Sequence, residues 1–403
     1  MRNLSSVLLM KKVVLAAALV ILAVGCDKTP VEEGGYKVPS NAVNYSENGT
    51  ANSYIVAPGS VAFISTEFKG NSTENRIEGI KDVKLVCQSE KDLVKELHYA
   101  SSKNGMVAIT GELSGNAVVA VVDDKDEVLW SWHLWITDYD PAVSLFETTS
   151  WKFMDRNLGA VSMEKGTFGK NAGLIYQWGR KDPFPSAVSF TEMNEDYTYT
   201  VDGEPTLYDI NGAELPKVSS LAQTDGTIEK GIAHPEVFYK NVKIDTGEKD
   251  EYDQPIKVDN PRTGDWSDIS DDDAWGGVSM KKSIYDPCPV GYKVPVCDAE
   301  GNTPYAWIKY AEREWDTEYN GLTQNGQWFP TIGTRVYASG GLDYTSAAPY
   351  SGMWIGTAGK ASADLEANPT LYGQYMMITS AKRTLKVNKD RRSQGLSVRC
   401  VAE

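Results

Sequence analysis

Histidine is scarce in this 403-residue chain, and its scarcity limits the chemistry that the chain can support. No two of the three histidines, His98, His133 and His234, fall at a metal-ligand spacing. The sequence has no His-Glu-x-x-His motif, no Cys-x-x-Cys pair and no Gly-x-Ser-x-Gly nucleophile turn. A zinc enzyme or a histidine-dependent hydrolase would therefore have to assemble from isolated residues. We predict that the protein is not an enzyme and has no catalytic residues.

Basic residues are also fewer than acidic residues. The chain has 40 Lys and Arg residues against 55 Asp and Glu residues, which gives a net charge of −15. A nucleic-acid-binding protein needs a basic face that neutralises phosphates, whereas the basic residues of this chain are dispersed. We therefore exclude nucleic acid as a partner and expect the acidic excess to form a solvated surface.

Apolar runs are short, and the longest covers residues 13–24. A membrane-spanning helix needs about 20 apolar residues, so this run is too short to be one. Two lysines precede it and small residues follow it, as in a cleaved signal peptide. The run ends in Leu22-Ala23-Val24-Gly25-Cys26, which resembles the lipobox of bacterial lipoproteins, although Ala23 stands where leucine is usual. The resemblance implies a signal peptide over residues 1–25 and a lipid on Cys26.

The predicted lipid determines where the protein lies in the cell. Acyl chains would hold it on a membrane while the rest of the chain stays in water, and we expect a lipid-anchored protein of the outer membrane and cell surface. Residues 26–45 contain Pro, Gly and Glu and little that is apolar, which predicts a flexible tether. The alternatives are an uncleaved anchor or an ordinary secretory signal.

Export would place the remaining cysteines in a compartment that permits disulfides. Besides Cys26 there are Cys87, Cys288, Cys297 and Cys400, which allow three pairings. Cys288 lies in the turn of residues 286–295, which three prolines stiffen. We prefer a disulfide between Cys288 and Cys400, which would tie the end of the chain to that turn. Free buried cysteines are the alternative.

Residues 46–141 have the pattern of an all-β sandwich with about seven strands. Short apolar runs rich in β-branched and aromatic residues recur at regular intervals and are separated by turn residues. The predicted strands are residues 53–56, 61–64, 84–87, 106–109, 116–122 and 128–136. In the last strand Trp130, Trp132 and Leu134 share one face, and Ser131, His133 and Trp135 share the other. If exposed on the sandwich, Trp135 and His133 are expected to contact the second domain or a partner.

Residues 142–403 are predicted to form a second domain, so the fold class is mainly β with some α (α+β). One short helix is expected over residues 172–179 with Asn171 as its cap, and another from Thr303, with Ile308, Ala311 and Trp315 on one face. Residues 188–273 are polar and too long for a simple loop, which predicts an insertion with its own hairpins. The remaining predicted strands are residues 328–330, 352–356, 375–378 and 397–401.

Four segments of this region form a recognisable set: Asp155-Arg156-Asn157-Leu158-Gly159-Ala160, residues 173–185, residues 284–295 and Ser397-Val398-Arg399-Cys400-Val401. Together they resemble a family of Bacteroidetes surface lipoproteins whose C-terminal half is the Fibrobacter-type major paralogous domain. The resemblance implies an α+β domain of C-type-lectin-like architecture after an N-terminal sandwich. It also implies a surface-anchored protein of the fimbrial accessory or adhesin kind. It does not imply an assigned catalytic activity. Cys297 departs from the family pattern and is a competing partner for Cys400.

Two sets of residues are candidates for ligand contact. The loops of the C-terminal region are rich in tyrosine, an amphipathic residue suited to binding surfaces, and the candidates are Tyr305, Tyr310, Tyr337, Tyr344 and Tyr350. Carboxylates gather between residues 265 and 273, where oxygen ligands for Ca²⁺ would be Asp268, Asp271 and Asp273. The spacing is not that of an EF-hand, which favours a solvated acidic loop. We predict no cofactor, with Ca²⁺ as the alternative.

These observations support three hypotheses about function. The first is a non-enzymatic, lipid-anchored adhesin or tip-like fimbrial subunit that binds a glycan or a host protein, with fimbrial subunits as further partners. The second is a glycan-capturing lipoprotein that serves a polysaccharide-uptake system. The third is an enzyme related to the sulfatase-modifying oxidases, whose chemistry needs a reactive cysteine pair that only Cys288 and Cys297 could supply.

Overall fold

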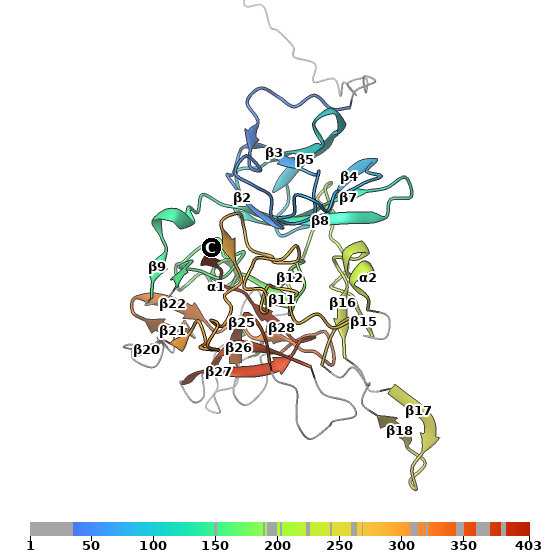
Figure 1. The fold of residues 1–403 in the computed structure, drawn as a ribbon, viewed down its shortest axis with the longest axis vertical. Helices are drawn as coiled ribbons and strands as arrows, with labels where there is room; N and C mark the ends of the chain where they lie inside the picture. The colour runs from blue at the N-terminus through green and yellow to red at the C-terminus, as the bar shows by residue number, and fades with distance from the viewer. Residues whose placement is uncertain are drawn as a thin grey trace, which may run out of the picture.

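Strands make up most of the ordered secondary structure, and the predicted mainly-β fold class is confirmed (Figure 1). The computed structural model describes residues 35–148, 151–187, 190–191, 200–201, 204–222, 226–241, 244–258, 264–267, 269–306, 313–316, 318–319, 321–343, 350–359, 371–379 and 384–403. The predicted signal peptide and Cys26 lie outside these residues. Among the described residues, none of the helices has both the length and the apolar character that crossing a membrane requires.

The N-terminal part is a sandwich of two four-stranded sheets. One sheet has the order β1 (Val43–Asn44), β3 (Val61–Ser65), β6 (Gly105–Thr110) and β5 (Val94–Ala100). The other has the order β2 (Ser53–Val56), β8 (Val128–Ile136), β7 (Gly115–Val122) and β4 (Asp82–Gln88). Each predicted strand of this region is present. The sequence analysis missed β1 and β5, and a 3-10 helix, η1 (Ser101–Lys103), follows β5.

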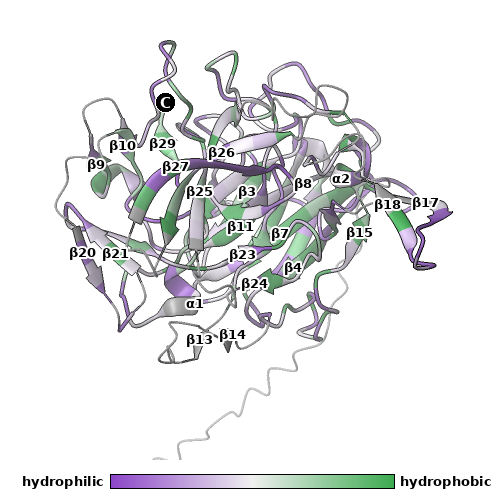
Figure 2. Cartoon of the chain, turned by 90° about the horizontal axis from the view of Figure 1, so that it is seen from below, coloured by the Kyte–Doolittle hydropathy of each residue, from purple (hydrophilic) through white to green (hydrophobic). Residues whose placement is uncertain are grey.

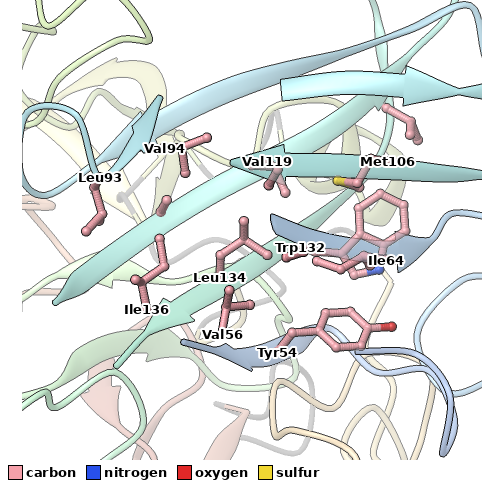
Figure 3. Packing of buried hydrophobic residues seen from close by; sticks show 14 of the residues in the cluster. Tyr54, Val56, Ile64, Leu93, Val94, Met106, Val119, Trp132, Leu134 and Ile136 are labelled. Atoms are coloured by element: carbon pink, nitrogen blue, oxygen red, sulfur yellow. The ribbon is translucent and has the colours of Figure 1, made fainter. Parts of the chain in front are cut away.

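The core of the sandwich lies between its two sheets (Figure 3). Trp132, Leu134 and Ile136 of β8 point into it, because alternate residues of a strand share a face. Val119 of β7 and Met106 of β6 meet them there. Fully burying a side chain of this size contributes roughly 1.5–3 kcal/mol, so the alternation along β8 is a main source of the stability of the sandwich.

The opposite face of β8 is buried too. Ser131, His133 and Trp135 are each at most 1% exposed. Trp135 belongs to a second core, together with Trp178, Trp354 and other residues from beyond position 141. The predicted contact of this face with the second domain is therefore present. The sandwich and the C-terminal unit, by which we mean residues 146–403, pack together through it.

The C-terminal unit is built on a mixed sheet. Its main path has the order β12 (Phe184–Pro185), β11 (Leu174–Gln177), β28 (Gly395–Ser397), β25 (Tyr350–Gly359), β26 (Tyr372–Thr379) and β27 (Thr384–Arg391), with β23 (Thr334–Arg335) and β24 (Leu342–Asp343) off this path. A four-stranded sheet has the order β19 (Tyr292–Lys293), β29 (Val401–Ala402), β10 (Lys152–Phe153) and β9 (Phe146–Glu147). A three-stranded sheet contains β20 (Arg313–Asp316), β21 (Gly321–Gln324) and β22 (Gln327–Pro330). A 3-10 helix, η2 (Pro141–Val143), joins the sandwich to this unit.

The insertion at 188–273 carries its own small elements, as predicted. Two antiparallel pairs are β13 (Phe190–Thr191) with β14 (Thr200–Val201) and β17 (Ile244–Lys249) with β18 (Pro255–Val258). Between them, β15 (Ser220–Ala222) and β16 (Phe238–Lys240) pair in parallel around helix α2 (Ile228–Ala233). The β17–β18 pair projects from the body of the molecule (Figure 1).

Both helix predictions for the C-terminal unit need correction. Helix α1 (Phe168–Asn171) ends at the predicted cap, and the predicted body contains strand β11. Gly173, with a φ of 77°, breaks the helix, and β11 pairs with β12 and β28, so tertiary pairing overrides the apolar spacing. Trp315 was expected on a helix face but lies in β20, opposite Leu322. Ile308 and Ala311 lie outside the described residues.

Candidate functional site: a cleft between the sandwich and the C-terminal unit

The turn at 286–295 connects both halves of the protein. Cys288 forms a disulfide with Cys400, so the preferred pairing is confirmed and the competing pairing of Cys297 with Cys400 is wrong. Cys87 and Cys297 are free thiols. The bond joins positions 112 residues apart and ties the end of the chain to the turn.

Two charged side chains stabilise this turn from within. Asp286 accepts hydrogen bonds at 2.8 Å from the main-chain N–H groups of Cys288 and Val294. Lys282 donates to main-chain oxygens of the same turn, those of Cys288, Pro289 and Tyr292. Burial raises the pKa of Asp286 to about 6, and Lys282 opposes that shift. The turn is thus a rigid frame with few unsatisfied polar groups.

The same turn docks on the sandwich through β2 and the residue before it. The side-chain amide of Asn52 donates to the main-chain oxygens of Ile284 and Asp286, both at 2.8 Å. The Ser53 hydroxyl lies 2.6 Å from the main-chain oxygen of Pro287. These bonds join residues more than 230 positions apart and fix the turn against the edge of the second sheet.

A second contact between the units is a buried charge pair. Lys181 Nζ lies 2.6 Å from Asp182 Oδ1 and also donates to the main-chain oxygen of Ser131 at 3.1 Å. The Ser131 hydroxyl donates to the same Asp182 oxygen at 2.6 Å. Burial lowers the pKa of Lys181, and Asp182 opposes that shift. Breaking a buried pair leaves a charge unpaired, so this contact specifies how the segment after β11 sits on β8.

Arg180, the residue before this pair, holds the insertion. Its guanidinium donates to the main-chain oxygens of Val237 at 2.6 Å and His234 at 2.9 Å. His234 is the C-terminal cap residue of α2, where carbonyl groups lack partners within the helix. Burial lowers the pKa of Arg180. Its role is to anchor α2 beside the sandwich.

His133 lies buried in the same interface, between Ser53 and Asn116. Its Nε2 lies 2.9 Å from Asn116 Oδ1, and the Asn116 amide nitrogen donates to the main-chain oxygen of Gly159. With that orientation of Asn116, Nε2 carries a proton, and Nδ1 lies 3.0 Å from the Ser53 hydroxyl oxygen, whose hydrogen goes to the Pro287 oxygen. Burial lowers the pKa of His133 to about 3. Its two partners, Ser53 and Asn116, each donate to a main-chain oxygen of the C-terminal unit, those of Pro287 and Gly159.

Beside His133 the two units leave an open cleft of about 450 Å³. Its sandwich wall comes from β4, β7 and β8 and the turns next to them. Its other wall comes from residues 161–187 and from Pro205 and Leu207. The volume is within the range of small-molecule sites, about 300–1,000 Å³. The site therefore lies between elements that the disulfide, the buried charge pair and His133 hold in place.

The lining of the cleft combines apolar walls with a polar mouth. Phe184 is buried in the wall, and Pro183 and Pro185 flank it. Glu90 and Lys170 are exposed at the mouth and offer one carboxylate and one ammonium group. The other hydroxyl and amide groups of the lining come from Ser89, Ser114, Asn116, Thr167 and Ser186. Such a surface fits a ligand with flat apolar faces and several hydrogen-bonding groups.

Cys87 also lines the cleft, as a thiol that is not part of a disulfide. Burial raises the pKa of its thiol to about 12. The thiolate is the reactive form of cysteine, and this thiol stays protonated at neutral pH. Cys87 is part of the wall of the cleft.

The tyrosines predicted for ligand contact do not form a common surface among the described residues. Tyr305 is 2% exposed and packs on Phe153 with 5.1 Å between ring centroids, so its predicted display is wrong. Tyr337 is half-buried beneath Arg391. Tyr350 is the first residue of β25, but the structure does not describe its side chain. Tyr310 and Tyr344 lie outside the described residues.

The predicted calcium ligands have structural partners. Asp271 accepts a hydrogen bond from the Asp273 N–H, and Asp273 accepts hydrogen bonds from the N–H groups of Val278 and Ser279. Both carboxylates thus close turns. Asp268 lies outside the described residues, within which no group of three or more potential metal ligands occurs.

Sequence reasoning identified few residues of the cleft. His133 was expected at a domain contact, and Phe184 belongs to a segment that carried the family resemblance. Glu90 and Lys170 gave no signal, because each is an ordinary charged residue on a turn or short helix. They line the same cleft only because the two units pack together.

No family model, curated protein or solved structure matches this chain. The resemblance to Bacteroidetes surface lipoproteins therefore stays a prediction. The cleft is the feature of this structure that bears on function.

Proposed function

We propose that this protein is a non-enzymatic, lipid-anchored cell-surface protein, an adhesin or tip-like fimbrial subunit, that captures the end of a glycan chain in the cleft. The observation that carries the proposal is the open cleft of about 450 Å³ between the two units. A pyranose ring has apolar faces and a rim of hydroxyl groups. Pro183 and Pro185, which are half-buried in the wall, suit the faces, and the polar mouth suits the hydroxyls.

The rigidity of the cleft supports binding. Ordering loops and side chains on association costs free energy, and a pre-formed site avoids part of that cost. The buried pair of Lys181 and Asp182 directly precedes the lining residues 183–187, and the lining residues His133 and Asn116 are hydrogen-bonded to each other. A ligand would enter a site that is already shaped.

The position of the first described residues supports attachment through the sandwich. The Tyr36 N–H donates to the main-chain oxygen of Tyr99 in β5, and its ring stacks on His98 with 3.9 Å between centroids. A lipid on Cys26 would be joined to the sandwich at this point. Most of the C-terminal unit extends away from the sandwich (Figure 1), toward the medium in this arrangement.

The cysteines weigh against the oxidase hypothesis. That chemistry needs two reactive thiols in a cleft, but Cys288 is bonded to Cys400. Burial raises the pKa of Cys297. Its side chain packs in a hydrophobic cluster with Phe153 and Tyr305 and does not line the cleft.

A glycan array tests the proposal. The chain from residue 26 onward, with Cys26→Ser to keep it free of lipid, is applied to the array, and any ligand found is titrated against Leu207→Trp. Leu207 is half-buried in the wall of the cleft, so an indole there fills the cleft. The control is Leu113→Trp, at a residue that is 54% exposed and is not part of the lining.

We expect at least tenfold weaker binding by Leu207→Trp and unchanged binding by the control. No glycan ligand for the wild-type chain, or equal binding by both variants, would contradict the proposal. The neighbouring genes distinguish this proposal from the uptake-system alternative. Genes for fimbrial subunits support the adhesin, whereas genes for glycoside hydrolases and an outer-membrane transporter support the uptake system.

A further inference from the structure

Strand β27 concentrates basic residues in an acidic protein. Its sequence, Thr384–Arg391, contains Lys386, Lys389 and Arg391 against the single acidic residue Asp390, while the whole chain has a net charge of −15. Lys386 and Lys389 are exposed. β27 is the last strand on the main path of its sheet, and hydrophilic residues fill most of its length (Figure 2).

Aromatic rings lie directly beneath two of these cations. Lys389 Nζ is 4.5 Å from the ring centroid of Tyr372, and the Arg391 guanidinium carbon is 4.2 Å from that of Tyr337. Residues two apart on a strand share a face and are separated by about 6.8 Å. Lys389 and Arg391 therefore form, with Tyr372 and Tyr337, a short row of paired cations and rings. A row of this kind offers charge and flat apolar surface side by side.

We propose that this basic row on β27 is a second binding surface and that it takes an acidic polysaccharide, a polymer of uronic acids. Carboxylates of such a chain pair with Lys389 and Arg391, which share one face of β27, and sugar faces pack on the tyrosine rings. The inference rests on glycan binding as the proposed function, but it does not depend on the cleft.

The position of β27 suits a long polymer. The strand lies at the end of the molecule opposite the sandwich, where the first described residues attach (Figure 1). A general attraction for polyanions is opposed by the net charge of −15, since like charges repel. Binding of a polyanion would therefore have to come from a local feature such as this row.

Lysines on a sheet edge also have a simpler role, because they prevent edge-to-edge aggregation. The two roles differ in a measurable way. A purely protective role predicts no affinity for a uronate polymer and more self-association when the lysines are removed.

The test uses oligogalacturonate as the probe and its carboxyl-reduced form as the neutral probe. Both are titrated against the lipid-free chain at about 50 mM and 200 mM salt. The variant Lys389→Met with Arg391→Met removes the two charges of the row and keeps aliphatic packing on Tyr372 and Tyr337. The matched control, Lys81→Met with Lys125→Met, removes two exposed lysines from the sandwich and changes the net charge equally.

We expect oligogalacturonate to bind, the reduced form to bind at least tenfold more weakly, and affinity to fall with salt. The β27 variant loses at least tenfold in affinity, and the control does not. The inference is overturned if wild type does not bind, if both probes bind alike, or if the two variants behave alike. Equal binding of a DNA duplex of matched charge also overturns it.

The same titrations separate this inference from the proposed function. Leu207→Trp, which fills the cleft, leaves oligogalacturonate binding at β27 within threefold of wild type. If neutral glycans bind in the cleft and oligogalacturonate binds nowhere, only the inference fails. If no glycan of any kind binds, both fail.

Discussion

The side-chain amide of Asn52 donates to the main-chain oxygen of Asp286 at 2.8 Å, across 234 positions of sequence. Asn52 also accepts a hydrogen bond at 3.0 Å from Trp130 Nε1 in the sandwich core. One side chain thus joins the core of the sandwich to the turn that carries the disulfide. The shape of the cleft depends on this contact and on the others that join the two units.

Replacing Asn52 tests how much this contact stabilises the protein. Asn52→Ala removes two hydrogen bonds to the turn and leaves Trp130 Nε1 buried without its partner. We expect a loss of about 1–3 kcal/mol in the free energy of unfolding, measured by urea denaturation. Asn75→Ala, at an exposed loop residue, is the control and should change the free energy by less than about 0.5 kcal/mol. Equal effects of the two changes would contradict the role of Asn52.

Trp135→Ala tests the packing between the units. Trp135 has no exposed surface and lies in the core shared by β8 and the C-terminal unit. Removing a buried aromatic ring leaves a cavity, and we expect a loss of about 3–5 kcal/mol. Val143→Ala, where the side chain is 84% exposed, should have almost no effect. Two separate unfolding transitions in wild type, with only one affected by Trp135→Ala, would show that the units do not unfold together.

The disulfide makes a prediction about thiols and about stability. In the lipid-free chain with Cys26→Ser, denaturation without reductant should expose two titratable thiols, Cys87 and Cys297, and reduction should expose four. Replacing both Cys288 and Cys400 by Ala should lower the free energy of unfolding by about 2–5 kcal/mol. Four thiols before reduction would exclude the bond.

His133 predicts a specific dependence of stability on pH. Burial lowers its pKa from 6.5 to about 3, so between these values the unfolded chain binds a proton that the folded chain does not. Stability is therefore lost as the pH falls through this window, by up to about 1.4 kcal/mol per pH unit from this residue.

Urea denaturation of wild type and of His133→Gln at pH 7, 6 and 5 checks this prediction. The variant should lose less stability than wild type as the pH falls. Asp286, whose pKa burial raises to about 6, has the opposite effect on the pH dependence. It is present in both proteins, so it cancels in the comparison. His234→Gln, at an exposed histidine, should follow wild type. Identical slopes for wild type and His133→Gln would contradict a neutral, buried His133.

The sequence predicted the sandwich well because its signals are local. In β8 the order of tryptophans and small or polar residues assigns each side chain to a face, and both faces are as expected. β5 was missed because Lys95 and Glu96 interrupt its apolar pattern. Helix spacing around Ile175 was misleading, since β11 gains its partners, β12 and β28, from distant parts of the chain.

The candidate site was harder to predict than the fold. The sequence predicted the partner of Cys288 from the stiff turn and the position of Cys400. The sequence could not predict the cleft, because the walls of the cleft bring β4 and β7 together with residues 161–187, and no short motif encodes that packing. Tyr305 was expected at the surface because a polar loop surrounds it, but its ring fills the core beside Phe153.

Hydrogen exchange with and without ligand tests the central claim most directly. The lipid-free chain is measured by mass spectrometry alone and with a saturating amount of the best glycan from the array. The account predicts slower exchange in peptides that cover residues 114–118, 167–174 and 183–187, which line the cleft from both units. Slower exchange elsewhere, with these three segments unchanged, would contradict it.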